Sequence, residues 1–152
     1  MKACFLYLGA FLEDREIPVW KLIWLWIAEG FIRQSGCKGL KDMAEDYLME
    51  LINRNLIIVS EKGSNGRKKS CIIHDLLREL CLRKANEEKF MQQVYKYEEK
   101  SSPSSPFTDK PSRLCIYSAD FPHSSLMPFV PNAKSLLCFA VDVLPNFTAF
   151  IC

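Results

Sequence analysis

The apolar residues between positions 56 and 84 change from the spacing of short strands to the spacing of a helix, and this change constrains the fold more than any other feature. A β-branched run, LIIVSEK (56–62), precedes a glycine-containing loop, GSNGRKK (63–69), and a second apolar run, SCIIH (70–74). Two such runs joined by such a loop predict a β-hairpin. A helical pattern follows directly, with inward positions Leu76, Leu77, Leu80 and Cys81 and outward positions Arg78, Glu79, Arg83 and Lys84.

Three further helices are predicted before the hairpin. Residues 3–11 form a short apolar run that ends at the acidic cluster 13–16, and Pro18 suits the first turn of a second helix. Because this second helix is apolar on all sides, we expect neighbouring elements to enclose it. Residues 40–54 show the one-sided pattern of an amphipathic helix. Three helices, a hairpin and a closing helix predict a winged-helix arrangement in which the hairpin is the wing.

The residues beyond position 90 predict a second, incomplete domain. MQQVYKY (91–97) favours another strand, and KSSPSSPFTDKPS (100–112) has the composition of a linker. RLCIYS (113–118) and SLLCFAV (135–141) resemble strands that begin about 22 residues apart, within the period of leucine-rich repeats. The alternative is a strand pair that packs on the first domain.

The expected architecture is therefore mainly α with a β-hairpin. A winged-helix domain occupies residues 1–95, a linker residues 96–112, and the start of a leucine-rich repeat region residues 113–152. The abrupt end of the second region favours a fragment or a truncated gene model.

Composition limits the classes of protein that the chain can represent. With 152 residues, of which 49% are hydrophobic and 25% charged, it can bury one ordinary core. Its net charge of +2 gives no strong attraction to nucleic acid or acidic lipid. Seven cysteines without framework spacing suit the reduced thiols of an intracellular protein, so we expect no structural disulfides. The apolar N-terminus lacks a signal-peptide cleavage site, and the run 19–32, which contains Lys21 and Glu29, is too short to span a bilayer.

His74 and Asp75 are the candidate binding residues, because they stand where the second strand gives way to the helix. An aspartate at a helix start can accept hydrogen bonds from the unpaired amides of the first turn, and the helix dipole favours its charge. A histidine at the same corner can donate a hydrogen bond to an anion such as phosphate. The structural alternative is that Asp75 only caps the helix and His74 only ends the strand.

Enzymatic and metal-binding alternatives fit the spacing poorly. Cys81 lies about two helical turns beyond His74, and Cys71 is expected on the opposite face of the strand, so neither thiol can pair with the imidazole. A zinc site built from Cys71, His74, Cys81 and His123 has no repeated CxxC motif.

A DNA-binding winged helix is the main functional alternative. Arg67, Lys68 and Lys69 in the expected wing could contact phosphates. The helix 40–54, which would enter the groove, carries four acidic residues, Asp42, Glu45, Asp46 and Glu50. Repulsion between this helix and the DNA argues against nucleic acid as a partner.

Four segments, in this order, resemble the plant intracellular immune receptors that combine a nucleotide-binding NB-ARC domain with leucine-rich repeats. They are CFLYLGAFLEDREI (4–17), LIWLWIAEGFI (22–32), LKDMAEDYLMELINRNLI (40–57) and CIIHDLLRELCLRKANEEKF (71–90). The closest likeness is to the coiled-coil class typified by late blight resistance proteins of nightshades. It covers about the first 95 residues, and RLCIYS and AKSLLCF extend it more weakly toward the repeats.

The resemblance implies a function for the His74 corner. In such receptors the histidine of a Met-His-Asp motif contacts the phosphates of ADP and helps to hold the resting state; here Ile73, His74 and Asp75 match that motif, with Ile73 in place of methionine. Two other departures are Leu12, where proline is usual, and Trp24, where arginine is common. The expected function is therefore that of the winged-helix module of an ADP/ATP-dependent switch in the plant defence response, which includes the hypersensitive response.

The same resemblance defines the expected cofactors and partners. The complete receptor would bind ADP or ATP, but this chain has no G-x-x-x-x-G-K-[ST] motif, and one histidine donor contributes only about 1.5–3 kcal/mol. We therefore expect no nucleotide on this chain alone and no enzymatic activity. Its partners would be the nucleotide-binding lobe and repeats of the same receptor family, with a pathogen effector or a guarded host protein acting indirectly. The expected location is cytoplasmic or membrane-peripheral.

Overall fold

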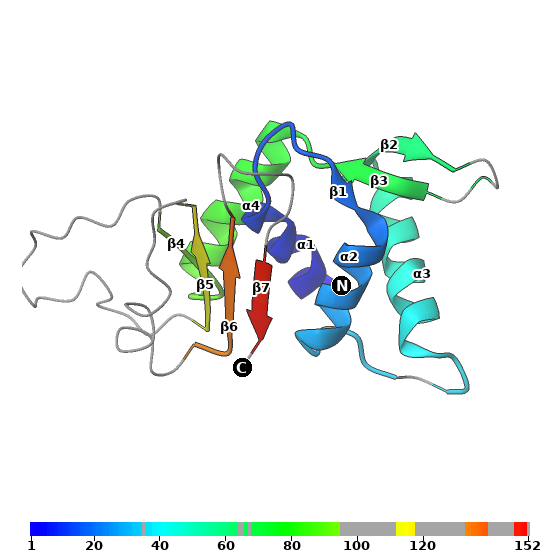
Figure 1. The fold of residues 1–152 in the computed structure, drawn as a ribbon, viewed down its shortest axis with the longest axis horizontal. Helices are drawn as coiled ribbons and strands as arrows, with labels where there is room; N and C mark the ends of the chain where they lie inside the picture. Colours follow the sequence, from blue (N-terminus) through cyan, green and yellow to red (C-terminus); the bar gives the residue numbers. More distant parts are fainter. Residues whose placement is uncertain are drawn as a thin grey trace, which may run out of the picture. The chain divides into compact units, whose positions relative to one another are not determined.

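The computed structural model describes residues 1–34, 36–63, 66, 68–94, 112–117, 133–139 and 148–151. The chain divides into two compact units, Met1–Lys84 and Ala85–Cys152. The described elements of the first unit are α1 (Lys2–Tyr7), the short 3-10 helix η1 (Leu8–Ala10), β1 (Ile17–Pro18), α2 (Val19–Ala28), α3 (Leu40–Asn53), β2 (Ile58–Lys62), β3 (Lys68–Ile72) and most of α4 (Asp75–Glu87). Figure 1 shows these elements along the chain.

Within the described residues, β1, β3 and β2 form one sheet in that order. The antiparallel pair β2–β3 confirms the predicted hairpin, and a register shift interrupts it after Val59. The sequence pattern missed β1, because its two residues, which pair with Ser70 and Cys71, are too few to show any periodicity. The structure also ends β3 at Ile72, so His74 lies just beyond the strand rather than within it.

The core of the first unit confirms the pattern of α3 and corrects that of α2. Ala44, Leu48 and Leu51 of α3 are buried, as expected for an amphipathic helix. The expectation that neighbours enclose α2 is wrong, because Trp20 and Trp24 remain 65% and 57% exposed. The buried residues of α2 are Val19, Leu22, Ile23, Leu25 and Trp26. Apolar residues on every side of a helix therefore did not mean burial on every side.

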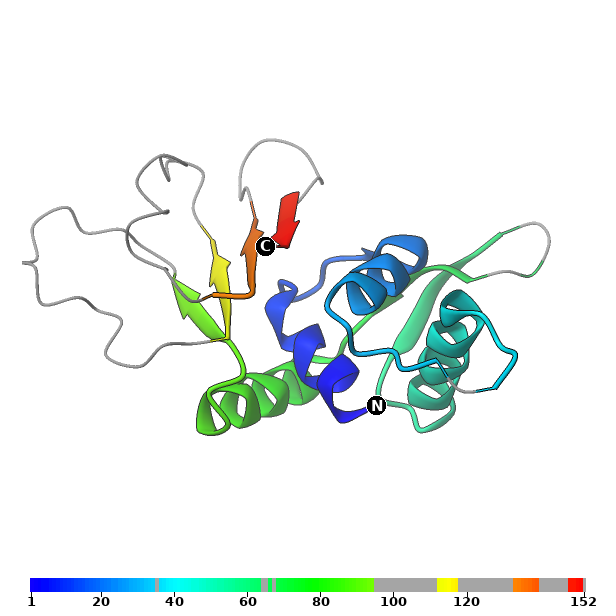
Figure 2. The same ribbon diagram turned by 90° about the horizontal axis from the view of Figure 1, so that it is seen from below.

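The predicted orientation of α4 is confirmed at Cys81, which is buried, and at Glu79, Arg83 and Lys84, which are exposed, but it is wrong at two positions. Leu76, expected to face inward, is 71% exposed, whereas Arg78, expected to face outward, is only 7% exposed. The buried stripe consists of Arg78, Cys81 and Ala85. Cys81 lies against η1, where a Cβ atom on Gly9 would be only 3.0 Å from the Cys81 Cβ. In both ribbon views α1 and α4 lie side by side (Figures 1 and 2). Gly9 of η1, which directly follows α1, allows the backbone there to approach α4 closely.

The described elements of the second unit include a sheet in the order β4 (Gln92–Val94), β5 (Arg113–Ile116), β6 (Ser135–Cys138) and β7 (Thr148–Ile151). The first three strands are parallel and pair at a constant offset of 22 residues, whereas β7 is antiparallel to β6. The strands expected near residues 113 and 135 are thus confirmed. Tyr117 and Phe139, which follow β5 and β6, stack with their ring centroids 5.0 Å apart.

The division between the units lies earlier than the expected domain end at residue 95. The strand β4, which precedes the Ser/Pro segment, pairs with β5, which follows it, and both strands belong to the second unit. The expected linker therefore connects two strands of one sheet, and its residues up to 111 lie outside the described part of the chain. Among the described residues, no helix has the length and apolarity that a membrane crossing requires.

Candidate functional site

The His74 corner, residues 73–76, connects β3 to α4. Ile73 is 2% exposed and anchors the connection in the core, whereas His74 and Asp75 are exposed. The backbone carbonyl of His74 accepts hydrogen bonds from the amides of Leu77 and Arg78, both at 2.9 Å. This geometry makes His74 the N-cap residue of α4 and Asp75 its first helical residue.

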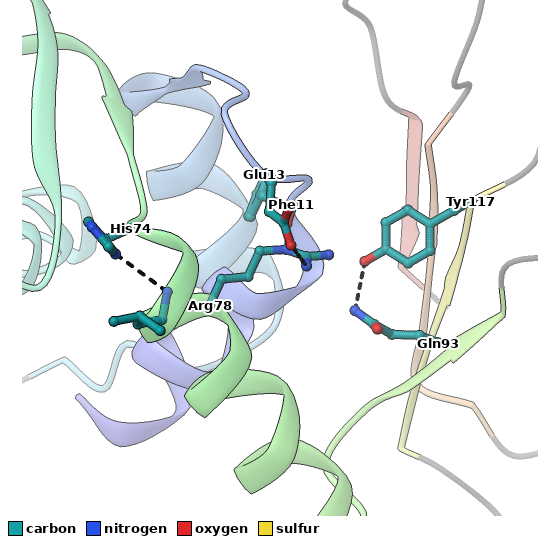
Figure 3. A network of polar contacts seen from close by, with 7 residues as sticks. Phe11, Glu13, His74, Arg78, Gln93 and Tyr117 are labelled. Atoms are coloured by element: carbon teal, nitrogen blue, oxygen red, sulfur yellow. Dashed lines mark hydrogen bonds and ion pairs between the residues drawn. The ribbon is translucent and has the colours of Figure 1, made fainter.

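The imidazole ring of His74 participates in the cap. Its Nδ1 atom accepts a hydrogen bond from the amide of Leu76 at 3.4 Å, a long distance for such a bond (Figure 3). An Nδ1 atom that accepts leaves the ring proton of neutral histidine on Nε2. The corner thus presents an Nε2–H donor from an exposed residue beside a helix N-terminus, an arrangement suited to an anion.

The expectation that Asp75 caps the helix is therefore corrected. The observed side-chain cap comes from His74, and Asp75 occupies the position that follows it. A carboxylate in the first turn still interacts favourably with the helix dipole, typically by about 0.3–1 kcal/mol. The sequence pattern placed both residues at the corner but exchanged their local roles, because it ended the strand at His74 instead of Ile72.

Arg78, at the end of the first turn of α4, is the residue near this corner whose role the sequence pattern missed. Its Nε atom donates to the Phe11 carbonyl oxygen at 2.5 Å, and its Nη1 atom donates to Glu13 Oε1 at 3.1 Å (Figure 3). A charged residue in an amphipathic helix is usually assigned to the solvent face, as it was here. The spacing of Arg78, Cys81 and Ala85 was the available signal, since two small residues at helical intervals suit a close helix contact.

The two cysteines nearest to His74 in sequence, Cys71 and Cys81, have buried thiols that donate hydrogen bonds to backbone carbonyls. Cys71 Sγ donates to the Ile17 carbonyl at 3.6 Å, and Cys81 Sγ donates to the Phe5 carbonyl at 3.2 Å. Burial raises the pKa of Cys71 and that of Cys81 from 9.0 to about 12. Both thiols therefore stay protonated near neutral pH, whereas a nucleophile or a zinc ligand must be a thiolate. The six cysteines of the described residues are thiols that take part in no disulfide.

The zinc set weighed from the sequence is not assembled in the described residues. Cys71 and Cys81 are buried, His74 is exposed, and His123 lies outside the part of the chain that the structure describes. Within that part there is no group of three or more histidine, cysteine, aspartate or glutamate residues that could hold a metal ion.

The exposed charges of α3 and the wing form local ion pairs. Glu50 pairs with Arg54 at 2.5 Å, and Asp46 pairs with Lys38 at 2.6 Å. On the wing, Lys69 pairs with Glu61 at 3.1 Å, while Arg67 lies outside the described residues. These pairs leave α3 with more acidic than basic side chains, which does not favour contact with a DNA backbone.

The helices, the wing sheet and the His74 corner together define a winged-helix domain. Residues 10–81 match the family described as the disease resistance protein winged helix domain. This part of the chain belongs to that family.

Sequences of relatives from Solanum demissum align with most of this chain. The putative late blight resistance protein homolog R1B-23 is 43% identical over 155 aligned residues, which cover 99% of this chain and 12% of that protein. The homolog R1B-12 is 44% identical over 119 residues, 78% of this chain and 8% of that protein. The homolog R1B-11 is 50% identical over 92 residues, 60% of this chain and 7% of that protein. The chain thus spans a small part of the relatives that it matches.

Proposed function

We propose that this chain is the winged-helix part of an intracellular plant immune receptor and that His74 senses ADP in the complete protein. The single observation that supports this proposal best is the orientation of the His74 ring: Nδ1 accepts a hydrogen bond from the helix, which leaves Nε2–H as the donor of an exposed residue. A diphosphate held by the nucleotide-binding lobe would accept this hydrogen bond in the resting state. Exchange of ADP for ATP would remove the contact and let the domain rotate, as a ligand-biased two-state element does.

The proposed cofactor and partners belong to the complete receptor. The lobe that binds ADP or ATP would cover the His74 corner, and a pathogen effector or guarded host protein would act through other parts of the molecule. The 22-residue offset of β4, β5 and β6 supports the proposal that the second unit begins a leucine-rich repeat region. A cytoplasmic location completes the proposal.

The test requires a receptor that contains both lobes. Residues 1–95 would replace the aligned segment of a complete late blight resistance homolog, and the ADP that copurifies with the protein would be measured by chromatography. His74→Asn keeps an acceptor at the N-cap but shortens the side chain and removes Nε2. We expect this variant to fold and to retain ADP about 10-fold to 150-fold more weakly, the equivalent of one charge-assisted hydrogen bond.

Arg83→Ala is the matched control, because Arg83 is exposed and lies more than two turns further along α4. The control should retain ADP like the unaltered receptor. Equal ADP retention in the His74→Asn variant and the control would refute the proposed contact.

A further inference from the structure

The Arg78 side chain connects the first turn of α4 to the loop that follows η1. It is 8% exposed, and its hydrogen-bond partners, Phe11 and Glu13, lie 67 and 65 residues earlier in the chain. A guanidinium group buried to this degree requires hydrogen bonds from the protein to replace those of water. The contacts with Phe11 and Glu13 provide such hydrogen bonds, although the Glu13 side chain itself is 59% exposed.

Arg78 is also linked directly to His74 through the backbone. The Arg78 amide donates to the His74 carbonyl at 2.9 Å, which is one of the first hydrogen bonds of α4. The side chain of Arg78 leaves the helix toward Phe11 and Glu13, whereas the His74 ring lies on the other side of the helix start (Figure 3). A displacement of Arg78 would thus move the turn that orients the imidazole.

The rest of α4 has its own attachment to the N-terminal segment. Cys81 Sγ donates to the Phe5 carbonyl, and Gly9 lies against Cys81 and Leu82. Because these contacts lie about one turn beyond Arg78, the helix body can stay docked when the Arg78 contacts are weakened. The first turn would then become more mobile, since helix ends open more easily than helix centres.

We propose that Arg78 is a positioning residue for His74: it holds the first turn of α4 against Phe11 and Glu13 and so fixes the direction of the Nε2–H donor. This inference rests on the proposed function for its biological meaning, but the geometry that it describes belongs to this chain alone. The loop after η1 would then influence His74, because a movement of Glu13 would displace Arg78 and, with it, the helix turn that orients the imidazole.

The experiment measures His74 directly in the 152-residue chain without nucleotide. Long-range ¹⁵N–¹H correlation spectra at pH 8 report which imidazole nitrogen carries the proton, and a His123→Gln background removes the signal of the other histidine. Glu13→Gln weakens the Arg78 ion pair but keeps the side-chain size and the bond to the Phe11 carbonyl. We expect the ¹⁵N chemical shifts of His74 Nδ1 and Nε2 to become more similar, because a loosened helix start would populate both tautomers of the ring. Amide hydrogen exchange at Leu76 and Leu77 should accelerate about twofold to fivefold, as for the loss of a partly exposed ion pair.

Glu50→Gln is the matched control, because it weakens the ion pair with Arg54 on the exposed face of α3. It should leave the His74 shifts and the exchange of Leu76 and Leu77 unchanged. Arg78→Gln should produce a larger effect than Glu13→Gln, and Arg78→Lys, which keeps the charge but offers a single donor group, should lie between Arg78→Gln and the unaltered chain. If Arg78→Gln does not fold, Glu13→Gln decides the question, since its side chain is more than half exposed.

Identical His74 spectra and exchange rates in the Glu13→Gln and Glu50→Gln chains would overturn the positioning role. The outcome is independent of the test of ADP retention. A His74 response to Glu13→Gln together with unchanged ADP retention in the His74→Asn receptor would reject only the proposed function. The opposite pair of results would reject only the role of Arg78.

Discussion

Gly9→Ala is the substitution whose effect the structure defines most closely. A Cβ atom at this position would lie 3.0 Å from the Cβ of Cys81, 3.1 Å from Cδ2 of Leu82 and 3.2 Å from the Leu82 backbone nitrogen. The Leu82 methyl group can rotate away, but the other two atoms move only with α4 itself. The added methyl group must therefore push η1 and α4 apart.

The expected cost follows from two opposing effects. Overpacking of a tight contact typically destabilises a protein by about 1–3 kcal/mol. Alanine also restricts the unfolded chain relative to glycine, which returns about 0.4–1 kcal/mol. From the middle of these two ranges, about 2 and about 0.7 kcal/mol, we expect Gly9→Ala to lower the free energy of unfolding of the first unit by about 1.3 kcal/mol.

Urea denaturation monitored by tryptophan fluorescence measures this change, because Trp26 is fully buried in the first unit. The control is Gly39→Ser at the N-cap of α3, where the added Cβ meets only the flexible end of Asp42 at 3.3 Å. Serine at an N-cap should stabilise the chain by a few tenths of a kcal/mol, at most about 0.5. An unaltered urea midpoint in Gly9→Ala, with an unchanged slope, would show that η1 and α4 are not in the tight contact described.

Three other predictions concern stability. His74→Ala should lower the free energy of unfolding by about 1 kcal/mol in urea titrations, whereas His74→Asn should cost less because asparagine also caps helices. Burial raises the folded-state pKa of Cys71 from 9.0 to about 12, so the unfolded chain loses the thiol proton first. The contribution of Cys71 is thus constant below about pH 9 and falls by about 1.4 kcal/mol per pH unit from there toward pH 12; in Cys71→Ala the alkaline decline should be shallower by this amount. Glu50→Gln should change the unfolding free energy by less than about 0.5 kcal/mol, and 1 M salt should abolish the change.

The sequence predicted the elements whose residues repeat a pattern over several turns. The helix α3 shows its apolar face three times, at Ala44, Leu48 and Leu51, and this repetition defined both its length and its buried side. The hairpin was recognisable because two β-branched runs flank a glycine-containing loop. By contrast, β1 has only two residues, and its pairing with Ser70 and Cys71, more than 50 residues further along the chain, determines that this short segment forms a strand.

Periodicity failed where a contact depended on size and hydrogen bonding rather than hydrophobicity. In α4 the short side chain of Cys81 faces Gly9 in a close contact and is buried, whereas the longer Leu76 lies outside. Arg78 joins the buried stripe because the Phe11 carbonyl and Glu13 accept its protons. Neither partner is visible in the local pattern of α4. The sequence placed His74 and Asp75 at the start of α4, where the structure also has them, but the atoms that orient the His74 ring could only be identified in three dimensions.

The chemistry of the cap gives a physical reason for histidine at position 74. A residue there must accept a hydrogen bond from the Leu76 amide and, in the proposed function, donate one to an anion. Neutral histidine has an acceptor and a donor on separate atoms of a rigid ring, so one interaction orients the other. Lysine supplies a donor but no acceptor, and asparagine supplies both on a shorter side chain. His74→Lys should therefore destabilise the start of α4 while it supplies a donor near the corner. His74→Asn should largely keep the cap but lose the donor that reaches the anion. Comparing the two variants separates the contribution of the cap from that of the ligand contact. His74→Ala, by contrast, removes both contributions.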